Sequence, residues 1–107
     1  MLGIDLSSIA QQVEIPLVES VTGTTPSITG QPNTRYVCGE VSTISITPPA
    51  SGTVDVIFES GSSVAILTVP NTVKWPVWFD ATSLDTDTTY ELLITDGVYG
   101  SVMTWAN

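Results

Sequence analysis

Short stretches of alternating apolar and polar residues dominate the chain after residue 33. In 53–59, Val54, Val56 and Phe58 fall on one side of an extended chain, while Asp55 and Glu59 fall on the other. Strand-like stretches also occur at 34–47, 64–70, 88–95 and 99–106. The first of them, read as one strand, puts Ser42, Ile44 and Ile46 on one face and Val41, Thr43, Ser45 and Thr47 on the other. Abundant threonine, valine and isoleucine favour strands, because β-branched side chains fit a pleated surface.

Turn residues separate these strands at short intervals. Pro48-Pro49 ends one strand and starts a turn, and the "SGSS" at 60–63 predicts a hairpin between 53–59 and 64–70. Asp96-Gly97 predicts a reverse turn that pairs 88–95 with 99–106. Asp80 is a candidate cap for one helical turn at 80–84. The pattern predicts an all-β fold, a small antiparallel β-sandwich or barrel.

The N-terminal third has a different pattern. Leu2, Leu6, Ile9 and Val13 recur at helical spacing and predict a short helix that needs tertiary packing to be stable. Residues 18–33 are rich in Thr, Gly and Pro, which indicates an extended linker with one short strand. We therefore expect an N-terminal docking arm and linker over 1–33 and a β-sandwich domain over 34–107.

Composition narrows the possible functions. The 107 residues suffice for one domain, and eleven acidic residues against Arg35 and Lys74 give a formal net charge of −9. Such a surface repels phosphate, so neither nucleic acid nor an anionic membrane is an expected partner. The single cysteine, Cys38, excludes an internal disulfide and predicts a buried, inert thiol. The first residues lack the charge pattern of a signal peptide and the length of a membrane span.

The chain lacks most of the residue types that catalytic and metal sites use. The chain has no histidine, and one cysteine cannot build a cysteine-rich zinc site, so we expect no catalytic residue, metal or cofactor. Asp55 and Glu59 share a strand face, but roughly 13 Å along a strand is too far for a glycosidase pair without help from another strand. The acids in 85–96 superficially resemble a calcium loop, but Tyr90 stands where that loop needs glycine.

The aromatic stretch 73–80, "VKWPVWFD", is the best candidate for recognition. On an extended chain Trp75, Val77 and Phe79 point to one side, as a core wedge, while Lys74 and Trp78 point to the other. Three interpretations remain open: core plus subunit interface, core alone, or a ligand platform. We take Lys74, Trp75, Trp78 and Phe79 as interface or binding candidates, together with Leu2, Leu6, Ile9 and Val13 of the arm.

Three stretches together resemble a β-module of bacteriophage and prophage structural proteins from gut Firmicutes, found on fibre, tail or head-associated polypeptides. They are "RYVCGEVSTISITPPASG", "VKWPVWFD" and "LDTDTTYE", and the resemblance runs from about Thr22 to the end of the chain. It implies a virion component. Together with the missing catalytic groups and the arm-then-domain layout, it leads us to expect a non-enzymatic protein that associates as a homotrimer and docks on a capsid or tail protein through its arm. The alternative function is a host-surface module that binds a glycan or protein through residues 75–79.

Overall fold

A computed structural model describes residues 16–107, which contain eight strands and no helix. The strands are β1 (Leu17–Val21), β2 (Ser27–Thr29), β3 (Thr34–Val41), β4 (Thr43–Thr47), β5 (Thr53–Ser60), β6 (Ile66–Thr68), β7 (Thr88–Thr95) and β8 (Tyr99–Ala106). They form a large sheet in the order β1-β3-β5-β7-β8 and a small sheet in the order β2-β4-β6. The all-β prediction is confirmed. The helix predicted around Leu2, Leu6, Ile9 and Val13 lies outside the described residues.

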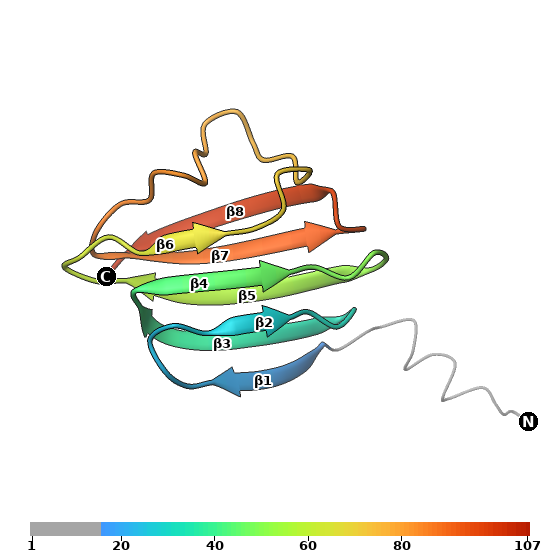
Figure 1. Cartoon of the computed structure of the whole chain (residues 1–107), viewed down its shortest axis with the longest axis horizontal. Helices are drawn as coiled ribbons and strands as arrows, with labels where there is room; N and C mark the ends of the chain where they lie inside the picture. The colour runs from blue at the N-terminus through green and yellow to red at the C-terminus, as the bar shows by residue number, and fades with distance from the viewer. Residues whose placement is uncertain (1–15) are drawn as a thin grey trace, which may run out of the picture.

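The chain alternates between the two sheets from β1 to β6, so these strands wind as three successive coils (Figure 1). Each coil places one strand in each sheet, and its strands pair in parallel with those of the next coil. Antiparallel pairing occurs between β5 and β7 and between β7 and β8. The prediction of a small antiparallel β-sandwich or barrel is therefore confirmed only as a mostly-β fold: the four pairings among β1 to β6 are parallel, and the sheets do not close into a barrel.

The strand predicted over 34–47 is two strands that belong to different sheets. The chain turns a corner at Ser42, where the N–H groups of Ser42 and Thr43 both donate to the Thr24 carbonyl, at 2.7 and 3.3 Å. A register shift of β3 against β5 between Val37 and Glu40, together with this corner, changes the alternation, so that Val41 and Ile44 both point into the core. The hairpin predicted at 60–63 is also a corner, since β5 and β6 lie in different sheets. There the buried Ser60 hydroxyl accepts a hydrogen bond from the Ala65 N–H at 2.9 Å.

The hairpin predicted at Asp96-Gly97 is confirmed. Both residues have positive φ, 55° and 68°, and Val98 N–H donates to the Thr95 carbonyl at 3.0 Å. Positive φ at both central positions matches the right-handed twist of the flanking strands.

The predicted domain boundary falls inside the β-structure. β1 pairs with β3 from Leu17↔Thr34 onward, and β2 pairs with β4 from Ser27↔Ser45 onward. Residues 17–29 thus find their hydrogen-bond partners within the two sheets, which is why they form the first coil and not a linker.

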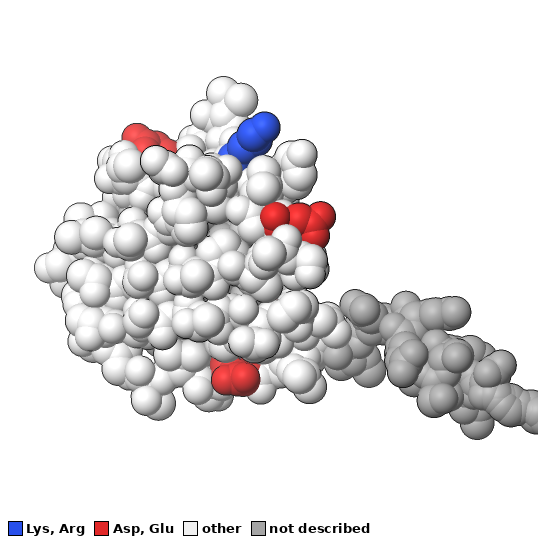
Figure 2. Space-filling view, turned by 45° about the vertical axis from the view of Figure 1, so that its right-hand side comes forward, with Lys and Arg blue, Asp and Glu red and all other residues white. Residues whose placement is uncertain are grey.

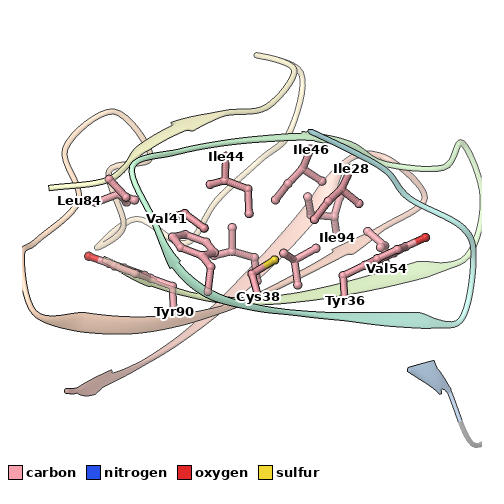
Figure 3. Close-up of a cluster of buried hydrophobic side chains, with 14 of the residues drawn as sticks. Ile28, Tyr36, Cys38, Val41, Ile44, Ile46, Val54, Leu84, Tyr90 and Ile94 are labelled. Atoms are coloured by element: carbon pink, nitrogen blue, oxygen red, sulfur yellow. The ribbon is translucent and has the colours of Figure 1, made fainter. Parts of the chain in front are cut away.

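The core lies between the sheets (Figure 3). Ile28, Ile44 and Ile46 from the small sheet face Cys38, Val54 and Ile94 from the large one. Val54, Val56 and Phe58 are fully buried, as predicted. Tyr36 and Tyr90 lie at opposite ends of the core. The Tyr36 hydroxyl accepts a hydrogen bond from the Gln31 N–H at 2.9 Å, and the Tyr90 hydroxyl accepts one from the Asp85 N–H at 2.7 Å.

The small sheet ends at β6, and a long connection, the 69–87 loop, follows it. Val73 and Leu84 of this loop are buried in the core, and Trp75 and Phe79 pack against it. The loop therefore covers the inner side of β7 and β8, as strands of the small sheet cover the inner side of β3 and β5. Figure 1 shows it arching beyond β6 and β8.

Candidate functional site

Aromatic side chains connect the core to the 69–87 loop. Phe58 stacks on Tyr90 with ring centres 5.5 Å apart, and Phe79 lies 6.1 Å from Tyr90. Trp75 meets Phe79 edge-on at 5.2 Å. Such offset and edge contacts stabilise aromatic clusters beyond simple burial. The prediction that Trp75 and Phe79 serve the core is confirmed.

Backbone hydrogen bonds hold this loop against β8. Lys74 N–H donates to the Val98 carbonyl at 2.6 Å, and Gly100 N–H donates to the Lys74 carbonyl at 2.8 Å. The Trp75 indole lies directly on Gly100, where a Cβ atom would overlap the ring. The Lys74 side chain is exposed.

The alternation predicted for 74–79 fails at Val77. Phe79 N–H donates to the Pro76 carbonyl at 3.0 Å, so Pro76–Phe79 is a turn and not an extended segment. Val77 and Trp78 occupy the tip of the turn, with Val77 fully exposed and Trp78 63% exposed. The outward position predicted for Trp78 is confirmed, whereas the prediction of Val77 as part of the core wedge was wrong.

A groove of about 610 Å³ separates the loop from β6. Leu67, Val73, Trp75 and Phe79 supply apolar walls, and Asp80 lies among the polar residues of the lining. Hydrogen bonds from the Thr82 hydroxyl and N–H lower the pKa of Asp80. The same bonds, with Ser83 N–H on the Asp80 carbonyl at 3.1 Å, make 80–83 a capped turn where one helical turn was predicted.

The outer faces of the two sheets differ in chemistry. The side of the small sheet away from the core carries hydroxyl side chains plus Ile66; the hydroxyl residues are Ser27, Thr29, Thr43, Ser45, Thr47 and Thr68. The corresponding side of the large sheet, here called the apolar outer face, carries seven larger apolar side chains. They are Val18, Val37, Ile57, Leu93, Tyr99, Met103 and Trp105. Five of these, all except Ile57 and Leu93, are exposed.

Three charged side chains lie at the centre of the apolar outer face. Arg35 of β3 donates from Nε to Asp55 Oδ2 of β5 at 2.7 Å, and its Nη2 lies 3.4 Å from Glu91 Oε2 of β7. Asp55 and Glu91 are only 8% and 6% exposed. Asp55 and its hydrogen bond raise the pKa of Arg35.

Arg35 links the two carboxyl groups, because its Nε contacts Asp55 and its Nη2 contacts Glu91. Burial raises the pKa of Glu91, and the nearby Asp55 carboxylate raises it further, against an opposing effect of Arg35. Asp55 Oδ1 is buried and has no hydrogen-bond partner among the described residues. The sequence analysis paired Asp55 with Glu59, whereas the structure brings Glu91 to it from another strand.

Cys38 is buried, as predicted, and burial raises the pKa of its thiol. Within residues 16–107, no three His, Cys, Asp or Glu side chains gather as a metal site would require. The same residues include no helix long and apolar enough to cross a membrane. The 85–96 segment contains strand β7, as the alternation within it predicted.

Comparisons with models of protein families, with curated proteins and with solved structures found no match for this chain.

Proposed function

We propose that the protein is a non-enzymatic structural component of a bacteriophage particle, a head fibre, capsid decoration or tail-associated protein. In this proposal it associates with further copies of itself through the apolar outer face. It docks on a capsid or tail protein through the residues before Leu17. The resemblance of the sequence to phage structural modules supports the virion role and the expectation of a trimer.

One observation carries the self-association: the contrast between the two outer faces. Serine and threonine predominate on the small sheet, as befits a surface in water, whereas the large sheet exposes valine, methionine, tyrosine and tryptophan among its polar residues. Those polar residues are Ser20, Glu40, Thr53, Glu59, Thr89, Thr95 and Ser101, besides the central charged group. Sheets with parallel strands are usually covered on both faces. A contiguous exposed apolar area usually marks a contact surface. Figure 2 shows another side of the molecule, where acidic groups lie far apart and most side chains are uncharged.

The occupant we infer is a second copy of this chain. Of the ionisable residues on this face, Arg35, Asp55 and Glu91 lie at its centre, and Arg35 contacts both of these buried acids. The exposed acids Glu40 and Glu59 lie one row further along. The exposed apolar side chains of the face can meet the same side chains of a second copy, as the interface of a symmetric homo-oligomer requires.

The test compares two matched pairs of substitutions by light scattering across protein concentrations. Val37→Thr with Met103→Thr removes two apolar groups from the apolar outer face. Val64→Thr with Ile66→Thr removes two exposed apolar groups near β6. We expect an oligomer for the wild type and the second variant, and weaker association for the first. A wild type that is monomeric at every concentration refutes self-association, and purified particles that lack the protein refute the virion role.

The second candidate function is recognition of a host-surface glycan or protein by the loop tip. Its specific support is the exposure of Val77 and Trp78 beside a groove that contains aromatic and polar groups. Such exposed aromatic groups can stack on a sugar or a peptide. An aqueous quencher should then reach Trp78 in the assembled oligomer, and Trp78→Ser should abolish binding in a glycan screen without changing the oligomer. Fluorescence that stays unquenched contradicts this role.

A further inference from the structure

A buried oxygen at the centre of the apolar outer face lacks a donor. Asp55 Oδ2 accepts from Arg35 Nε at 2.7 Å, while Asp55 Oδ1 is buried and has no partner within residues 16–107. A buried carboxylate oxygen without a hydrogen bond costs free energy, so native structures normally supply a donor.

Glu91 is the group placed to supply it. Both its carboxyl group and that of Asp55 contact Arg35, and its Oε2 lies 3.4 Å from Arg35 Nη2. An ionised carboxylate only accepts hydrogen bonds, whereas a protonated one gains an O–H donor. Two buried carboxylates beside one guanidinium would leave a net negative charge, and one proton removes both that charge and the missing bond.

We infer that Glu91 is protonated and donates its O–H to Asp55 Oδ1, and that Arg35 balances the negative charge of Asp55. The proton comes from solvent and returns to it, so the three side chains together change from neutral to −1 as it leaves. Resting on the proposed function, we further infer that this proton favours association, because a neutral centre avoids placing like charges against each other.

Few other charges act on this site. Along the strands, Glu91 is in register with Ile57 of β5 and Met103 of β8, neither of which titrates. β1 presents Val18 and Ser20 to this face, and Tyr99 lies at its far end. Glu40 and Glu59 are register partners one row further along the same face, and both are exposed.

The sign of the pH dependence follows from the raised pKa of Glu91. Between the unfolded pKa, about 4.3 for glutamate, and the higher folded value, the folded protein binds more protons than the unfolded chain. The contribution to stability is complete below about pH 4.3 and is lost as pH rises through the folded pKa.

The direct test is a carbon-13 NMR titration of the Glu91 carboxyl group in the wild-type protein, at a concentration where it is monomeric. We expect its midpoint well above about 4.3, the ordinary glutamate value. A midpoint at or below that value overturns the protonation of Glu91.

Glu91→Gln provides a second test, because its amide can donate to Asp55 Oδ1 at every pH. Urea unfolding from pH 5 to 8 should show the free energy of unfolding of the wild type falling relative to that of this variant. The slope against pH should correspond to at most about one more proton bound by the folded state than by the unfolded state. Glu59→Gln, which changes an exposed acid on the same face, is the control and should retain the slope due to Glu91. If the stabilities of the wild type and Glu91→Gln fall in parallel with rising pH, the proposal is wrong.

Sedimentation at pH 5.5 and 8 separates this inference from the proposed function. We expect the wild type to associate more weakly at pH 8, and Glu91→Gln to associate equally at both. Monomers under all conditions refute the self-association while leaving the NMR result to decide the proton. Equal pH dependence in wild type and variant refutes the link between the proton and association.

Discussion

Gly100 gives the sharpest test of how the 69–87 loop is held. Its Cα lies in β8 opposite Ile94, on the inner side of the large sheet, and the Trp75 indole occupies the space of the missing side chain. In Gly100→Ala the new methyl group would overlap the ring, so the indole must move away and loosen its contact with Phe79.

The expected magnitude is the balance of two effects. Overpacking a well-filled site costs about 1–3 kcal/mol, while replacing glycine by alanine within a strand recovers about 0.5–1 kcal/mol. We therefore expect a net loss of up to about 2.5 kcal/mol. With a urea m-value of about 1.5 kcal/mol/M, the unfolding midpoint should fall by up to about 1.7 M.

The assay is urea unfolding followed by tryptophan fluorescence, with Gly39→Ala as the matched control. Gly39 also lies in a strand and has ordinary negative φ, but a Cβ there meets no atom within 4 Å. It should be neutral or slightly stabilising. Combining Gly100→Ala with Trp75→Leu should cost less than the sum of the two changes, since the shorter side chain removes the overlap. A Gly100→Ala protein as stable as wild type, with unchanged emission, would refute this account of the loop.

Three further outcomes are expected. Ile46→Ala removes a fully buried side chain from the small sheet and should cost about 2–5 kcal/mol in urea unfolding; a loss under about 1 kcal/mol would contradict the core described above. Cys38 is buried with a raised pKa, so a thiol reagent should modify it only after urea is added, and prompt reaction in the folded protein would contradict its burial. Glu19 points to the inner side of edge strand β1, so Glu19→Val should increase aggregation measured by light scattering. Glu59→Val changes a central strand and should increase aggregation less. Equal aggregation of the two variants would show that Glu19 does not protect the edge.

The sequence predicts the strands better than their partners, and the physical reason is visible at Ser42. Alternation with period two tells which side chains share a face, but it holds equally for a strand in either sheet and in either direction. The corner at Ser42 depends on the Thr24 carbonyl, which is far away in sequence. The Asp96-Gly97 hairpin could be predicted because its signal is local: two residues that tolerate positive φ between two alternating runs.

A local pattern does not show which distant segments meet, and this also limits what could be predicted of the candidate site. The outward position of Trp78 could be predicted from its own segment, whereas Val77 was misplaced because a turn closed by Pro76 and Phe79 replaces the extended chain. The proximity of Asp55 to Glu91 depends on the register between β5 and β7, which no local pattern contains. Arg35 was the available signal, since one of only two cations on a strand beside a lone aspartate demands a partner.

The coil topology also explains why the apolar outer face is a better place for self-association than the ends of the sheets. At the β8 end, the 69–87 loop covers the inner side of the large sheet, and Trp75 fills the space above Gly100. At the other end no described residue pairs with the outer edge of β1, and Glu19 places a charge on its inner side, which discourages another strand from completing the core there. End-to-end stacking of copies would bury that charge, whereas face-to-face association would bury exposed valine, methionine and tryptophan side chains. The cost of burying an unpaired charge exceeds what a few apolar contacts recover, so under the proposed self-association we expect the apolar outer face, and not the β1 edge, to form the contact.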